Sequence, residues 1–110
     1  MLSCIFACST EPGVFNDVIV EVEDFAEYNN GYGNVGRVVL GVENSGVVPI
    51  YSASISLRLE TDRHSYYTTV RDESGIPPET KVYITVEFTY LSPGERATET
   101  GIVITDSFFY

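Results

Sequence analysis

The 110-residue sequence has no tryptophan, one histidine and two cysteines, and these shortages exclude several kinds of site. Both cysteines, Cys4 and Cys8, lie in the first eight residues, so no disulfide can brace the rest of the chain. Structural zinc needs four ligands, and His64 has no second histidine or cysteine beyond that segment. We therefore expect no metal ion and no other cofactor.

Basic residues are also scarce. Six Lys and Arg stand against sixteen Asp and Glu, which gives a formal charge of −10 at pH 7. Nucleic acids and anionic lipid surfaces are both bound through clustered basic side chains, so we expect neither as a partner. The excess of acid favours solubility through charge repulsion, with calcium or a cationic partner as the alternative. One stretch without any basic residue suggests an acidic edge or loop rim; its acids are Asp17, Glu21, Glu23, Asp24 and Glu27.

Long apolar runs are absent, so no segment approaches the roughly 20 residues of a membrane-spanning helix. The first twelve residues, MLSCIFACSTEP, resemble the end of a bacterial lipoprotein signal peptide, with Cys8 as the residue that receives lipid and Ser9 after it. The basic start of such a signal is missing, since no Lys or Arg precedes Arg37. We expect residues 1–13 to be a signal remnant or a disordered N-terminus, with a short first strand as the alternative, and residues 14–110 to form one domain.

Alternation of apolar and polar residues dominates the rest of the chain and predicts strands. The clearest case is residues 51–60, where Tyr51, Ala53, Ile55, Leu57 and Leu59 alternate with polar side chains, so that a strand would place all five on one face. The expected strands cover residues 18–23, 35–44, 51–60, 64–71, 81–90 and 96–104.

Turn signals separate these strands. Residues 24–34 contain three asparagines and two glycines, and we interpret them as a turn-rich loop. Pro77 and Pro78 stiffen a long polar connection, and residues 92–95, Ser-Pro-Gly-Glu, form a turn. Six or seven evenly spaced strands predict an all-β fold, an antiparallel immunoglobulin-like β-sandwich of about seven strands.

Three blocks resemble bacterial immunoglobulin-like domains of the FxLYD type. They are residues 42–46 (VENSG), 49–57 (PIYSASISL) and 91–95 (LSPGE), and the similarity runs from about Val38 to Ile104. The resemblance implies an exported or surface lipoprotein domain used for interaction or assembly, without shared catalytic residues.

Signals for catalysis and ion binding are weak. His64 is the one available base of a Ser-His-Asp triad, and no nucleophile-elbow sequence accompanies it. Asp72, Glu73 and Glu79 do not have the spacing of an EF-hand loop, so a solvated loop is favoured over a calcium site. We expect no catalytic residues.

Tyrosine is the distinctive residue type, with eight in the chain. Tyr28 and Tyr32 fall in the predicted first loop, while Tyr66 and Tyr67 are adjacent in a strand and must point to opposite faces. Exposed tyrosines often mark contact surfaces, so these four form a candidate contact surface. The alternative is ordinary occupation of strand positions.

The sequence thus predicts a non-catalytic exported module of the cell envelope or exterior that binds protein or glycan, lipid-anchored through Cys8. An accessory structural domain in an envelope assembly is the alternative, and an enzyme ranks last. A glycan-binding module would require coplanar tyrosines in a groove; an accessory module would expose an unpaired edge strand or a large apolar patch.

Overall fold

The computed structural model describes residues 3–6 and 17–110, and every described element is a strand. The strands are β1 (Ser3–Phe6), β2 (Val18–Asn29), β3 (Asn34–Asn44), β4 (Ala53–Thr61), β5 (Ser65–Asp72), β6 (Thr80–Thr89) and β7 (Ala97–Phe109). They form two antiparallel sheets, one in the order β1-β2-β3-β6 and the other in the order β5-β4-β7. The prediction of an all-β fold is confirmed.

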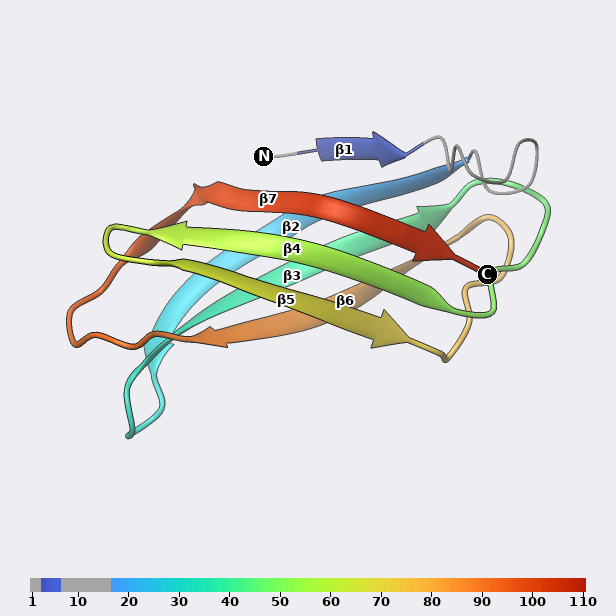
Figure 1. Cartoon of the computed structure of the whole chain (residues 1–110). Coiled ribbons are helices and arrows are strands. Elements are labelled where there is room, and N and C mark those ends of the chain that lie inside the picture. The colour runs from blue at the N-terminus through green and yellow to red at the C-terminus, as the bar shows by residue number, and fades with distance from the viewer. Residues whose placement is uncertain (1–2, 7–16) are drawn as a thin grey trace.

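The two sheets enclose one apolar core, with β7, β4 and β5 in front of β2, β3 and β6 in Figure 1. Alternation explains which residues reach it. In β4 the side chains of Ala53, Ile55, Leu57 and Leu59 are buried, and the residues between them are half-exposed. In β3 the inward residues are Val38, Leu40 and Val42, as the alternation predicted. Tyr51 does not share the inner face; it precedes β4 and is exposed.

The predicted loop over residues 24–34 is wrong. β2 continues to Asn29, and the connection to β3 contains only residues 30–33. The strand passes through a bulge between Val22 and Asp24, which shifts the register by one residue and lets pairing with β3 resume. Strand pairing therefore overrides the weak β propensity of residues 24–29.

The last strand is also longer than predicted. β7 runs to Phe109 rather than ending near residue 104, and its register against β4 shifts between Ser56 and Leu57. The extra residue of this bulge, Thr105, donates its hydroxyl to the carbonyl of Ser56 at 3.1 Å. Phe109 reaches the core as a result.

The long connection over residues 73–79 contributes to the core through Ile76. The backbones of Ile76 and Ile50 form an antiparallel bridge with hydrogen bonds of 2.7 and 3.0 Å, and both side chains are buried. The buried amide of Asn44 donates to the carbonyls of Val48 and Ile76, so it ties the β3–β4 and β5–β6 connections together.

Candidate functional site

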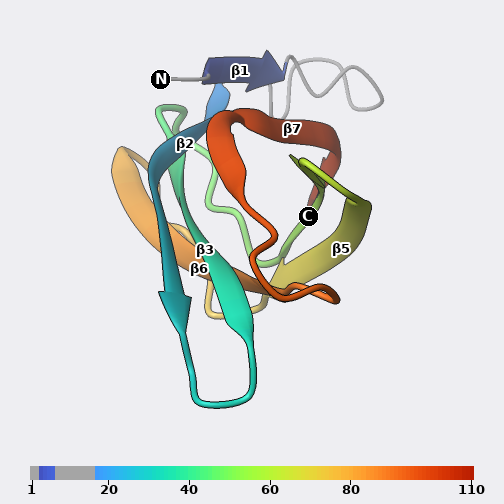
Figure 2. The same cartoon turned by 90° about the vertical axis from the view of Figure 1, so that its left-hand side faces the viewer.

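Three connections lie at one end of the two sheets; two are hairpin turns, and the third, between β6 and β7, passes from one sheet to the other. They are residues 30–33 between β2 and β3, residues 62–64 between β4 and β5, and residues 90–96 between β6 and β7. We call this the three-turn end; it is on the left in Figure 1 and faces the viewer in Figure 2. The β2–β3 hairpin projects away from the sheets in both views.

A buried carboxylate holds two of these turns together. Glu95 in the β6–β7 turn is 0% exposed. Its carboxylate accepts hydrogen bonds from the amide of Ser92 at 3.2 Å, the hydroxyl of Tyr66 at 2.9 Å and the hydroxyl of Thr61, and the Nδ1 atom of His64 lies 3.1 Å away. The carboxylate thus bonds its own turn and both sides of the β4–β5 turn.

These hydrogen bonds keep Glu95 ionised. Burial by itself would raise the pKa of this carboxyl, because a low-dielectric surrounding disfavours charge. The hydrogen bonds from Thr61, Tyr66, His64 and the Ser92 amide outweigh burial and lower the pKa of Glu95 to about 2. A buried charge of this kind is stable only while its donors stay in place.

A second carboxylate closes the neighbouring corner. Glu27 near the end of β2 accepts hydrogen bonds from the hydroxyl of Tyr90 at 2.7 Å, from Nε of Arg96 at 2.7 Å and from the amide of Ala97 at 2.9 Å. Burial tends to raise the pKa of Glu27, but these donors lower it on balance. The β2 strand is thereby fixed to the start of β7.

Two stacked tyrosines lie between the two carboxylates. The rings of Tyr66 and Tyr90 have centroids 5.9 Å apart with an interplanar angle of 26°. Burial first, and then the hydrogen bond to Glu27, raise the pKa of Tyr90. Tyr66 also accepts a hydrogen bond from the amide of Leu91 at 2.8 Å. The interior of the three-turn end is therefore a continuous, fully bonded polar and aromatic cluster.

The β2–β3 turn is held by its asparagines. The carboxamide oxygen of Asn29 accepts from the amide of Gly31 at 2.8 Å, and that of Asn30 accepts from the amides of Tyr32 and Gly33. Gly31 has a φ of 94°, a conformation that glycine adopts without steric cost. The side chain of Tyr32 is 98% exposed on this braced turn.

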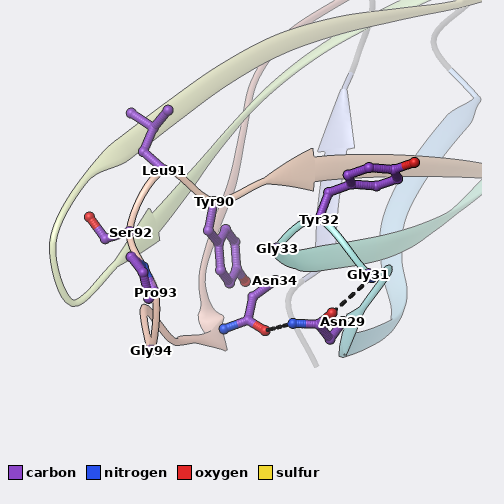
Figure 3. A pocket seen from close by; sticks show the side chains of 10 residues that line it. All are labelled: Asn29, Gly31, Tyr32, Gly33, Asn34, Tyr90, Leu91, Ser92, Pro93 and Gly94. Carbon is purple, nitrogen blue, oxygen red and sulfur yellow. Dashed lines mark hydrogen bonds between the residues drawn. The ribbon is translucent and has the colours of Figure 1, made fainter.

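A cleft open to solvent separates the β2–β3 turn from the β6–β7 turn (Figure 3). Its volume is about 360 Å³, and Tyr32, Asn29, Asn34, Tyr90 and Pro93 are among its lining residues. The carboxamides of Asn29 and Asn34 bond each other at 3.2 Å. The cleft thus offers an aromatic rim and amide groups that can bond a peptide or a polar side chain.

The four predicted contact tyrosines do not form one surface. Tyr28 lies on the outer face of β2 and donates its hydroxyl to Glu87, and Tyr32 lies at the hairpin tip. Tyr66 points between the sheets, whereas Tyr67 is 71% exposed on the outer face of β5. The prediction that Tyr66 and Tyr67 point to opposite faces is confirmed. Of these four tyrosines, only Tyr32 lines the cleft.

Glu27, Tyr90 and Glu95 were not among the predicted site residues. The sequence pattern places Glu95 only within a turn and Glu27 only in a run of acidic residues. The signal for the roles of Glu27 and Glu95 is weak in the sequence because, apart from the Ser92 amide, their donors are 29 to 70 residues away along the chain. The pattern at residues 91–95 did locate the turn that contains Glu95.

The remaining predicted features are placed as follows. His64 bonds Glu95 and lies beside Tyr66, and its side chain is 39% exposed. Asp72 accepts from the amide and hydroxyl of Ser74. Among residues 3–6 and 17–110 there is no group of three or more His, Cys, Asp or Glu placed to hold a metal ion.

Cys8, the predicted lipidation residue, lies outside the described residues. Within the described ranges there is no helix of the length and apolar character needed to cross a membrane. Comparisons of the chain with protein families, with curated proteins and with solved structures found no match.

Proposed function

We propose that this chain is a non-catalytic binding module of the cell envelope, an immunoglobulin-like sandwich of about seven strands that contacts a protein partner through its three-turn end. The strand order supports the fold assignment, because β3 pairs with β6 in one sheet while β4 and β5 form a hairpin in the other. Chain crossings of this kind between two antiparallel sheets are typical of immunoglobulin-like domains.

The observation that carries the proposal is Tyr32. A large aromatic side chain at 98% exposure gains nothing from the core, and the hydrogen bonds of Asn29 and Asn30 hold its turn in one conformation. A rigid turn that presents an aromatic side chain loses little conformational entropy on binding. The adjacent cleft adds amide groups for hydrogen bonding.

A protein is favoured over a glycan as the partner. Sugar rings bind on flat, exposed aromatic platforms. The described ring pairs are the edge-to-face pair His64–Tyr66 and the stacked pair Tyr66–Tyr90, and both contain Tyr66, which points between the sheets. A glycan array probed with the wild-type chain and with Tyr32→Ala tests this choice. Glycan binding that depends on Tyr32 would overturn it.

Photocrosslinking tests the contact itself. Benzoylphenylalanine replaces Tyr32 in cells that naturally make the protein, and Tyr83 is the matched control because it is 63% exposed on the outer face of β6. We expect a discrete protein adduct from position 32 and none of that mass from position 83. Equal adducts at both positions, or none at position 32, would contradict the proposal.

We further propose that Cys8 carries the lipid anchor that places the module outside the cytoplasmic membrane. Labelling of cells with an alkyne-bearing fatty acid tests this assignment. The label is expected in the wild type and in Cys4→Ser and to be absent from Cys8→Ser. Label that persists in Cys8→Ser would refute the anchor.

A further inference from the structure

The outer edge of β2 divides into two halves with different neighbours. Residues Val18–Glu21 pair antiparallel with β1, from Phe6 opposite Val18 to Ser3 opposite Glu21. The bulge between Val22 and Asp24 ends that stretch, because a bulge turns the backbone groups away from a common ladder. Beyond it, Glu27 bonds the amide of Ala97 at the start of β7. The edge along Val18–Glu21 therefore accepts a strand of four residues.

The strand that occupies this edge precedes the proposed lipidation residue. β1 covers Ser3–Phe6, and Cys8 follows it by two residues. Maturation at Cys8 hydrolyses the peptide bond between Ala7 and Cys8; the reaction consumes one water and leaves a free α-amino group on Cys8. β1 is then no longer part of the chain. We propose that the mature protein uses the vacated edge of β2 to bind an extended, cationic segment of a partner protein as an added strand, an inference that rests on the proposed anchoring at Cys8.

The backbone supplies the attraction. An edge strand presents unpaired N–H and C=O groups, and a partner strand that pairs with them gains hydrogen bonds irrespective of its side chains. Val18 and Val20 are buried at 1% and 0% exposure with β1 in place. Residues directly opposite one another in an antiparallel pair share a face. A partner residue opposite either valine thus faces the core, so an apolar residue is preferred there.

The charge of β2 selects the partner. Asp17, Glu21, Glu23, Asp24 and Glu27 succeed one another without an intervening basic residue. Glu23 and Glu27 are already paired with Lys81 and Arg96 within the chain. Asp17 and Asp24 flank the edge and are exposed, so they are the carboxylates that Lys or Arg residues beside a bound strand would meet. Two copies of β2 would place like charges side by side, and like charges across a strand pair are destabilising. A segment with apolar residues flanked by Lys or Arg fits the edge, whereas a second copy does not.

The experiment starts from the whole chain so that folding precedes exposure of the edge. A protease recognition sequence is inserted between Phe6 and Cys8, the folded protein is cut, and the released peptide is removed. The probe is a fluorescent peptide, Lys-Lys-Leu-Ser-Val-Ile-Phe-Lys-Lys, measured by anisotropy; in the register of β1 its Val and Phe lie opposite Val20 and Val18. We expect the cut protein to bind it and the uncut protein to bind at least about tenfold more weakly, since each missing backbone hydrogen bond reduces affinity several-fold.

Two control peptides separate strand pairing from other binding. A version N-methylated at alternate residues lacks the donors that face β2, and a version with Glu in place of Lys reverses the charge. Both should bind about tenfold more weakly than the probe, the first through lost hydrogen bonds and the second through repulsion. Equal binding of the N-methylated peptide would overturn the proposal.

Hydrogen exchange provides an independent readout. Cutting should speed exchange of backbone amides within Val18–Glu21, and the probe should slow it again, while amides of β4 stay unchanged. Unchanged exchange after the cut would overturn the proposal, as would a dimer of the cut protein in gel filtration. If the cut chain unfolds, the lysine peptide and not its N-methylated version must restore the folded circular dichroism spectrum. Fatty-acid labelling tests the lipid anchor at Cys8, whereas peptide binding and hydrogen exchange test the edge of β2. The two proposals can therefore fail independently, and the results show which one has failed.

Discussion

The hydroxyl of Tyr66 lies 2.9 Å from the carboxylate of Glu95, and this bond joins a strand of one sheet to the turn that leads from the other. Glu95 has no exposed surface, so its charge depends on the four groups that contact it. The three-turn end therefore gets its rigidity from a buried charge rather than from apolar packing alone. That rigidity holds the wall of the cleft beside Tyr32 in place.

Replacing Glu95 should destabilise the fold. In Glu95→Gln the negative charge is lost, and an amide NH₂ group replaces one carboxylate oxygen. This NH₂ group cannot accept the hydrogen bonds that the hydroxyls of Thr61 and Tyr66 donate to the carboxylate. We expect a loss of about 1–3 kcal/mol in the free energy of unfolding, the usual effect of unsatisfied buried polar groups. Urea denaturation measures it. Glu73→Gln is the control because Glu73 is exposed in the β5–β6 connection, and an equal effect of the two substitutions would contradict the role of Glu95.

Stability should fall in acid through the same carboxylate. The folded pKa of Glu95 is about 2, below the ordinary value of 4.5, so its contribution is present above pH 4.5 and is lost as the pH falls towards 2. Glu27, whose pKa is also lowered, acts in the same direction. Urea midpoints measured between pH 7 and pH 2.5 should decline more steeply for the wild type than for Glu95→Gln, which cannot titrate there. Parallel curves would show that Glu95 is not the responsible group.

Gly36 should not tolerate a side chain. A Cβ atom at this position would lie 2.4 Å from the hydroxyl oxygen of Tyr90, which donates to Glu27. Gly36→Ala must displace Tyr90, and we expect a loss of about 1–3 kcal/mol, as for other overpacked sites. At Gly33 the nearest atom to such a Cβ is 4.0 Å away, so Gly33→Ala should have little effect. Thermal unfolding of both variants compares them directly, and a harmless Gly36→Ala would mean that Tyr90 is not held as described.

Ile76 should contribute strongly to the stability of the fold although it lies in the connection between β5 and β6. Its side chain is 2% exposed and its backbone bridges Ile50. Ile76→Ala is expected to lower the free energy of unfolding by about 2–5 kcal/mol, the range for buried aliphatic truncations. Val47 is 86% exposed at the same end, so Val47→Ala should change stability by less than about 0.5 kcal/mol. Urea denaturation of the two variants decides whether the connection is anchored through Ile76.

The sequence predicted the parts of the fold that depend on local alternation. Residues 81–90 place Val86, Phe88 and Tyr90 inward, as expected from a period of two, and β4 follows the same rule. The predicted ends of β2 and β7 were wrong because both strands contain bulges. A bulge shifts the alternation by one residue, and a partner strand rather than local propensity then decides where the strand ends.

What the chain by itself determined is the class of fold and its strongly acidic character, because alternation and charge are properties of neighbouring residues. The tertiary structure alone decided that Glu27 and Glu95 are buried acceptors, that Tyr66 and Tyr90 stack, and that Tyr32 remains exposed. Each of these outcomes depends on groups that strand pairing brings together from distant positions, so no pattern within a short window could contain them. For the same reason, the four tyrosines that the sequence groups as one candidate contact surface, Tyr28, Tyr32, Tyr66 and Tyr67, have different surroundings in the fold.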